Sequence, residues 1–125
     1  MSESENQKVL FTIAADGRIG MFPSAAALES SMEPADADAT RVFEEDGTEL
    51  LLQVELELYN RQIDAVIASS PIEVPRVLVP DEPVKDESFL KLCLLKSVAD
   101  LPVDAMATLP DVVDAVKHRL SYGFH

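Results

Sequence analysis

Carboxylates are the residues of this chain best suited to chemistry, and two aspartates at alternate positions suggest a calcium site first. Asp36 and Asp38 open an acidic window of the length of an EF-hand loop, about 12 residues. That loop needs glycine at its sixth position and a bidentate glutamate at its twelfth. Arg41 and Gly47 occupy those positions here. The window therefore predicts no calcium site.

The single cysteine and the two histidines do not form a zinc pattern. Zinc ligands recur at short, fixed spacings, and Cys93, His118 and His125 have no partner at such a spacing. Cys93 lies among leucines, which favours a buried apolar side chain without a chemical role. His118 lies near the end of an expected helix, where a solvent-facing histidine is favoured. We therefore expect no metal and no cofactor.

Common catalytic patterns are also missing from the sequence. It has no nucleophile elbow, no papain-like motif and no Ser-x-x-Lys motif, and its four glycines form no phosphate-binding loop. Glu44, Glu45 and Asp46 are adjacent carboxylates, but at a water-exposed turn nothing divides them into an acid and a base. We therefore expect a protein that is not an enzyme. An enzyme with an unrecognised site is the less favoured alternative.

Negative charge is concentrated in the first half of the chain. Residues 1–58 carry a net charge of −10 and residues 59–125 one of −3, which together give −13. With 47% hydrophobic residues, the composition is typical of a folded protein with an acidic surface rather than of a disordered chain. Such a surface repels nucleic-acid phosphates and attracts basic proteins. We therefore expect a basic protein partner, a toxin or an effector, and no nucleic acid.

Two Asp-Gly turns divide the first half into two hairpins, because Asp-Gly readily adopts the positive φ of tight hairpin turns. The first hairpin pairs residues 9–14 with 18–22, and the second pairs residues 40–45 with 48–58. Between them, a short helix is expected from its N-cap Ser24 to Pro34, followed by a linker at 36–39. For residues 49–68, good helix formers make a helix the competing prediction. Alternation of apolar residues at 50–58 with mostly polar ones favours a strand.

Acidic residues of the second hairpin form the candidate binding face. Alternation in the strand beginning at Thr48 places its carboxylates on one face. Arg41 is the only basic residue expected nearby, and like charges on one sheet face repel each other. General solubility is the alternative explanation of this surface. The candidate partner-binding residues are Glu44, Glu45, Asp46, Glu49, Glu55 and Glu57.

The second half predicts edge strands followed by helices. Residues 62–79 are rich in Ile and Val, but prolines at 71 and 75 interrupt them, so one or two short edge strands are expected, with 76–79 better supported. Residues 80–86 predict a loop and 86–98 a buried helix. A last helix follows Thr108 and Asp111, a capping-box pair, and presents an apolar stripe of Val112, Val113, Val116 and Leu120. The predicted fold is α+β: an antiparallel sheet built from two hairpins with a short intervening helix, and C-terminal helices packed on one face.

Length and composition limit the class of protein. The length predicts a single domain over residues 1–125, with residues 1–8 flexible. One cysteine allows no intramolecular disulfide and gives no sign of an oxidising compartment. The start does not resemble a secretory signal, and no apolar segment approaches the roughly 20 residues needed to span a bilayer. We expect a cytoplasmic protein without membrane contact, and the sequence does not predict its oligomeric state.

Three segments of the first half carry a resemblance. They are LFTIAADGRIGMF at 10–22, SAAALE at 24–29 and VFEEDGTEL at 42–50, in the order hairpin, helix, hairpin. In this the chain resembles small acidic bacterial immunity proteins of toxin–immunity systems. The resemblance implies a non-catalytic inhibitor that binds a cognate toxin, often a nuclease with a basic cleft, in the cytoplasm of the producing cell. The alternative is a small acidic secretion chaperone that binds an effector segment as a homodimer, which an exposed apolar patch would favour.

Overall fold

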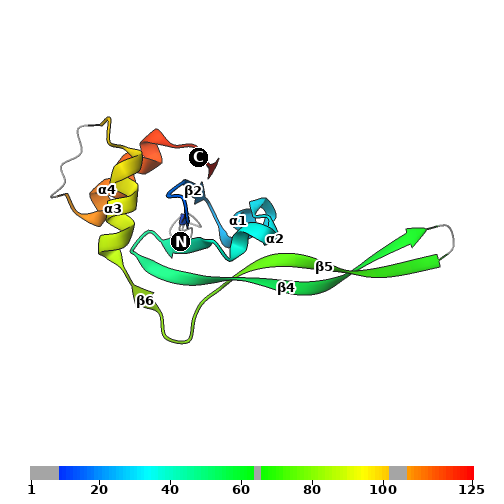
Figure 1. Ribbon diagram of the computed structural model, residues 1–125. Helices are drawn as coiled ribbons and strands as arrows, with labels where there is room; N and C mark the ends of the chain where they lie inside the picture. Colours follow the sequence, from blue (N-terminus) through cyan, green and yellow to red (C-terminus); the bar gives the residue numbers. More distant parts are fainter. Residues whose placement is uncertain (1–8, 64–65, 102–106) are drawn as a thin grey trace, which may run out of the picture.

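The computed structural model describes residues 9–63, 66–101 and 107–125, and the flexibility expected for residues 1–8 lies outside these ranges. The fold is α+β, as predicted: an antiparallel sheet, a short helix between strands and two C-terminal helices that pack together (Figure 1). The strand order is β5-β4-β3-β1-β2-β7, and β6 pairs with β4. The strands are β1 (Leu10–Ala14), β2 (Ile19–Phe22), β3 (Thr40–Glu44), β4 (Thr48–Ile63), β5 (Val66–Leu78), β6 (Val84–Lys85) and β7 (Gly123–Phe124). The helices are α1 (Ala25–Ser31), α2 (Pro34–Ala37), α3 (Glu87–Ser97) and α4 (Leu109–Arg119).

Both predicted hairpins are confirmed, and both turn where glycine takes a positive φ. The φ angles are +89° at Gly17 and +91° at Gly47. In each turn the aspartate before the glycine accepts a hydrogen bond from the backbone N–H two residues further on, at 3.1 Å from Arg18 to Asp16 and at 3.0 Å from Thr48 to Asp46. The aspartate and the glycine thus fix each turn locally, which is why the sequence predicts it.

Helix α1 begins where it was predicted to begin. The Ser24 hydroxyl accepts a hydrogen bond from the N–H of Ala27 at 3.1 Å, the geometry of an N-cap. The helix ends before Pro34, but the proline then occupies the first turn of α2. Proline suits that place because its φ is already helical and its missing N–H has no helical partner there. The linker expected at 36–39 is therefore wrong in part, since α2 extends to Ala37.

For residues 49–68 the strand prediction is confirmed and the competing helix is wrong, because the long strand β4 covers most of this range. The prediction of one or two short strands within residues 62–79 is wrong. The neighbour of β4, β5, is one continuous strand that runs through Pro71 and Pro75. It is an edge strand, as expected. The expected loop at 80–86 is also corrected, because β6 pairs there with the start of β4, through Thr48↔Lys85 and Glu49↔Val84.

The core lies on both faces of the sheet formed by β1, β2 and β3. Neighbouring residues of one strand point to opposite faces, so Val42 and Phe43 enter different clusters although both are fully buried. The α3 and α4 helices cover one face through a cluster that includes Phe11, Ile13, Met21, Phe43, Leu90, Leu94, Val112, Val113 and Val116. Helix α1 covers the other face through Leu10, Phe22, Leu28, Met32, Val42 and Leu50. The predicted packing of the C-terminal helices on one face is confirmed.

Local capping explains where the two C-terminal helices begin. The Asp86 carboxylate accepts a hydrogen bond from the N–H of Phe89 at 3.2 Å, which caps α3. Asp111 in α4 accepts hydrogen bonds from the N–H and the hydroxyl of Thr108, at 3.3 and 2.9 Å. Both helices lie close to their predicted positions. Within the described ranges, no helix combines the length and the apolar character needed to cross a bilayer.

Candidate functional site

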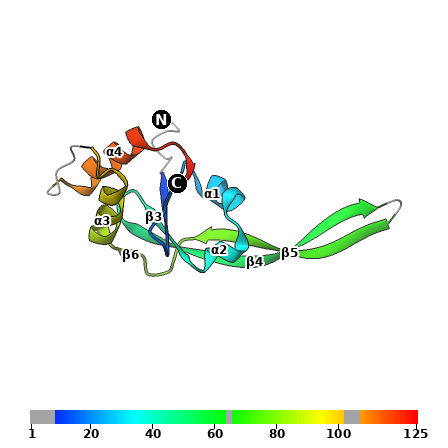
Figure 2. The same ribbon diagram turned by 45° about the horizontal axis from the view of Figure 1, so that its top comes forward.

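The most unusual feature of the molecule is a two-stranded arm, which we define as residues 53–63 of β4 and 66–76 of β5. The paired part of β3 reaches only the start of β4, at Val42↔Leu50 and Phe43↔Glu49. Beyond this point β4 and β5 pair with each other as far as Ile63↔Val66. The ribbon they form projects away from the helices and the rest of the sheet, as both views show (Figures 1 and 2). Two-stranded hairpins are only marginally stable alone in water. This arm therefore depends on a partner or on the contacts at its end next to the body, which we call its root.

One face of the arm carries a group of apolar side chains that are open to solvent beyond its first residues. The alternating leucines of β4 share a face, as predicted. Helix α1 covers this face only at the start of β4: Leu50 is 7% exposed, while Leu56 and Leu58 are each 72% exposed. Across the ladder, Ile67 belongs to the same face and is also 72% exposed. We call Val54, Leu56, Leu58, Ile67 and Pro71 the apolar arm face. The ladder places Glu73, Asn60 and Ser69 on the same side of the arm. Alternation revealed that these side chains share a face, but not that this face is uncovered.

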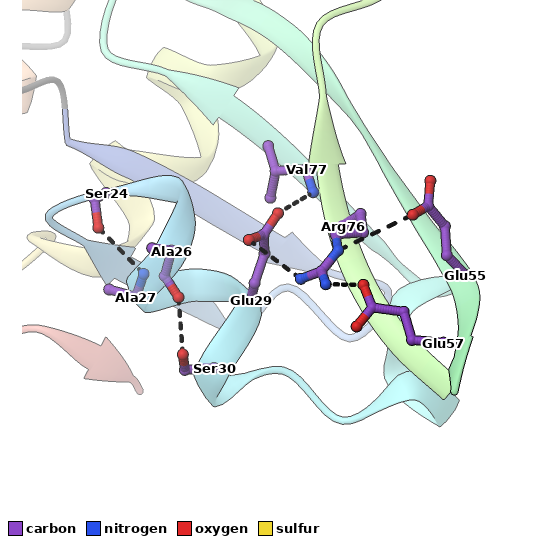
Figure 3. A network of polar contacts seen from close by, with 9 residues as sticks. All are labelled: Ser24, Ala26, Ala27, Glu29, Ser30, Glu55, Glu57, Arg76 and Val77. Atoms are coloured by element: carbon purple, nitrogen blue, oxygen red, sulfur yellow. Dashed lines mark hydrogen bonds and ion pairs between the residues drawn. The ribbon is translucent and has the colours of Figure 1, made fainter. Parts of the chain in front are cut away.

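The opposite face of the arm carries Glu55 and Glu57 at its root, where they meet one arginine. The Arg76 guanidinium lies among three carboxylates: it is 3.7 Å from Glu29 and 4.0 Å from Glu55, and it hydrogen-bonds Glu57 (Figure 3). Glu29 comes from α1 and also accepts a hydrogen bond from the N–H of Val77 at 2.8 Å. One positive charge against three negative ones leaves this cluster with a net charge of −2. The carboxylates raise the pKa of Arg76, chiefly through the hydrogen bond to Glu57.

Glu49, the next candidate residue towards the body, is held in a structural contact. Both of its carboxylate oxygens accept hydrogen bonds from Arg41, at 2.8 and 2.9 Å. The Arg41 guanidinium also lies over the rings of Phe43 and Phe89, 5.0 and 4.3 Å from their centres. The hydrogen bond from Arg41 lowers the pKa of Glu49 despite the opposing effect of burial. This carboxylate joins β4, β3 and α3 and is not free for a partner.

The three acids of the β3–β4 turn lie away from the arm. Glu45 forms an ion pair with Lys117 of α4, and Asp46 lies 3.6 Å from Lys85 of β6. Glu44 also has an interaction within the protein. The six predicted residues therefore do not form one uncompensated face, and the expectation that Arg41 is the only base nearby is wrong. Lys85 and Lys117, like Arg76, are distant in sequence, and only the fold brings them to these acids.

Other chemical groups are largely bonded within the protein. A shallow cavity of about 450 Å³ contains Asp16, Arg18 and His125 in its lining. The backbone N–H of Arg18 and, at 2.6 Å, its side chain donate hydrogen bonds to the Asp16 carboxylate, and these lower the pKa of this carboxyl. Nε2 of His125 bonds the Ser121 carbonyl oxygen at 2.6 Å. Among the described residues, no three metal-ligating side chains gather. The cavity gives no reason to assign a reaction.

The predicted exposure of His118 is confirmed, whereas the predicted burial of Cys93 is wrong in part. His118 is exposed, as expected, and its Nδ1 bonds the Asp114 carbonyl oxygen at 2.7 Å. Cys93 is only partly buried, which corrects the expectation of a fully buried thiol, because it lies on the rim of the α3 contact and not in its centre. Burial raises the pKa of this thiol.

Comparison with known proteins gives no relative from which a site could be transferred. No family model matches the chain, and neither a curated protein nor a solved structure matches it.

Proposed function

We propose that this protein is a non-catalytic protein-binding domain that engages a partner through the arm. The observation that carries the proposal is the projecting ribbon of β4 and β5, on which Leu56, Leu58 and Ile67 are each 72% exposed. Large exposed apolar patches on otherwise well-packed proteins mark interaction sites. The core clusters of the body include no residue of the arm, so we expect the body to fold without most of this ribbon.

Charge supports a basic partner. The chain carries −13 in all, and the root of the arm keeps a net −2 around Arg76. Charge complementarity accelerates the encounter of two proteins and selects between partners. A basic toxin inhibited by this chain is the partner that the resemblance of the first half implies, and we retain an immunity protein as the first candidate.

A secretion chaperone is the second candidate, and the exposed apolar arm face is the observation that favours it. Such a protein would hold an apolar effector segment and would form a homodimer. The two candidates differ in a simple measurement, because an electrostatic inhibitor can stay monomeric. Sedimentation of the purified chain at several concentrations therefore separates them.

Photo-crosslinking tests the proposal directly. A photoreactive amino acid is placed at Leu58 on the arm or, as a control, at Leu92, an exposed apolar residue of α3 in the body. In the cells that produce the protein, the Leu58 position should capture a basic protein that the Leu92 position does not capture. Equal capture from both positions, or none from Leu58, would contradict an arm-based binding function.

The captured protein then decides between the candidates. If expression of that protein alone arrests growth and co-expression with this chain restores it, the chain is an immunity protein. In that case, changing Glu55 and Glu57 together to lysine should slow association, and raising the salt from about 0.1 M to 1 M should have the same effect because the screening length falls from about 10 Å to 3 Å. A non-toxic captured protein together with a homodimeric chain would favour the chaperone.

A further inference from the structure

We infer that the outer edge of β4, from Val54 to Asn60, accepts an extended strand of the partner in which basic and apolar residues alternate. The inference rests on the proposed function, because it states how the arm holds its partner. It assigns recognition to main-chain hydrogen bonds along one strand edge. Three observations carry it: a closed edge on β5, an open edge on β4 and the charges beside the open edge.

The outer edge of β5 is closed to an added strand. The N–H of Val77 donates to the Glu29 carboxylate, so it points away from β4. Backbone groups two residues apart along a strand point the same way, which places the nitrogens of Pro75 and Pro71 on this outer edge as well. Proline has no N–H to offer, and prolines on an edge block strand addition. The same geometry explains how β5 runs through two prolines without losing hydrogen bonds to β4.

The outer edge of β4 is open. Val54, Leu56 and Leu58 are the ladder partners of Pro75, Glu73 and Pro71. In an antiparallel pair the two partners point their N–H groups both inward or both outward. The N–H groups of these β4 residues therefore point outward, and among the described residues no strand pairs with β4 on this side beyond Leu50. Residues 53–60 contain neither proline nor lysine, the residues that usually protect an exposed edge.

The side chains beside this edge define the chemistry of the occupant. An added strand would continue both faces of the arm, because side chains of neighbouring strands lie side by side. On one face its apolar residues would meet Leu56 and Leu58, which are exposed. On the other face its basic residues would meet Glu55 and Glu57, which belong to the cluster of net charge −2. A second copy of this chain would bring more carboxylates, so a basic strand is favoured over self-pairing.

A defined peptide tests the inference. The probe is acetyl-KVKVKVKV-amide, compared with acetyl-EVEVEVEV-amide, and binding is followed by NMR of the ¹⁵N-labelled full chain. The lysine peptide should shift the amide signals of Leu56 and Leu58 and leave the helices unaffected. The glutamate peptide should bind at least about tenfold more weakly, since it repeats the charge of the arm. Equal binding of both peptides, or of neither, would overturn the inference.

Two matched proline variants locate the edge. Leu56 and Glu73 are ladder partners, and each points its N–H away from the other strand, so proline at either position removes one outward N–H and no bond of the ladder. Leu56→Pro should weaken binding of the lysine peptide at least about tenfold, because one hydrogen bond is lost and a carbonyl loses its partner. Glu73→Pro should change it less than about threefold, a difference below 1 kcal/mol. A Leu56→Pro variant that binds as well as Glu73→Pro would overturn the inference.

A peptide modification keeps the test valid if Leu56→Pro disturbs the arm. Two versions of the lysine peptide carry N-methyl groups on every valine or on every lysine. An added strand uses the N–H groups of only one alternate set, so one version should keep its affinity and the other should lose it. Loss in both or in neither would contradict strand addition.

Self-pairing and failure of the proposed function have separate signatures. If the Leu56 and Leu58 signals shift with protein concentration alone and the chain sediments as a dimer, a second copy occupies the edge and the inference is wrong. If Leu58 crosslinks a basic protein but the lysine peptide does not bind as expected, the proposed binding function is supported and strand addition is contradicted. If Leu58 crosslinks nothing, the function itself is contradicted.

Discussion

The body and the arm use the same strand in opposite ways. At the root of β4, Leu50 is 7% exposed and packs with Leu28 and Val42, whereas Leu58, on the same face of the same strand, is 72% exposed. The sequence pattern is continuous from one leucine to the other, and only the neighbours change. A helix covers the first, and nothing among the described residues covers the second. One alternating pattern can therefore build a core at one end of a strand and leave an exposed apolar face at the other.

Different forces hold the two regions. In the body, fully buried side chains such as Phe11, Phe43 and Val116 pack between sheet and helices. In the arm, the β4–β5 hydrogen bonds and the Arg76 cluster at the root are the main contacts. Stability should therefore reside in the body and binding in the arm.

Aspartate at matched apolar positions should show the largest difference in stability between the body and the arm. Val116→Asp buries an unpaired charge at a fully buried position and should lower the free energy of unfolding by at least about 3 kcal/mol, enough to unfold or aggregate the protein. Leu58→Asp places the same charge on the exposed arm and should change it by about 0.5 kcal/mol or less. Urea denaturation measures both. Similar losses in the two variants would show that the arm is part of the core.

Shortening the arm should separate binding from stability. Residues 58–71 are replaced by Asn-Gly, which suits a two-residue hairpin turn between the ladder partners Glu57 and Ile72. The melting temperature should stay within about 5 °C of the parent value, a change on the order of 1 kcal/mol, because the core is untouched. Affinity for the lysine–valine peptide should fall at least about tenfold, because residues 58–60 of the open edge are removed and the edge is too short for an added strand. Unchanged affinity in the shortened chain would show that residues 58–71 take no part in binding and would contradict an edge that reaches Asn60.

Acid should weaken the contact between Glu49 and Arg41. The pKa of Glu49 is lowered in the folded protein, so its stabilising effect is complete above its ordinary value of 4.5 and is lost as the pH falls through the lowered value. Glu49→Gln should cost about 1 kcal/mol or less at pH 7, because the pair is partly exposed. The difference between parent and variant should shrink below about pH 4 as the parent loses the charge. Urea denaturation of parent and variant at pH 7 and below about pH 4 measures this difference. A difference that grows in acid would contradict the contact between Glu49 and Arg41.

The smallest effect is expected at Cys93, on the rim of the body. Cys93→Ala should lower the free energy of unfolding by about 1 kcal/mol or less, since the thiol is only partly buried. The raised pKa should also slow its reaction with a thiol reagent at pH 7, compared with the same chain in urea. Equally rapid labelling of the folded and unfolded chains would contradict this view and reopen the question of a reactive thiol.

Local signals in the sequence predicted much of this fold. Asp-Gly turns, the Ser24 cap and the Thr108–Asp111 pair act on neighbouring residues, so they can be recognised without the fold. The ion pairs of the acidic residues could not be predicted, because they join residues far apart in the chain, such as Glu45 and Lys117. The continuity of β5 was missed because the cost of a strand proline depends on which way its nitrogen points. The candidate site thus had its carboxylates named from the sequence, while the arm that carries Glu55 and Glu57 came from the structure.

Amide hydrogen exchange of the free chain tests the open edge of the arm most directly. At low protein concentration, the N–H groups of Leu56 and Leu58 should exchange rapidly because they point to solvent. Those of Glu55 and Glu57 should be protected by their hydrogen bonds to β5, which gives an alternating pattern along the strand. Equal protection at all four positions would mean that this edge is already covered in the free protein, and it would contradict the account.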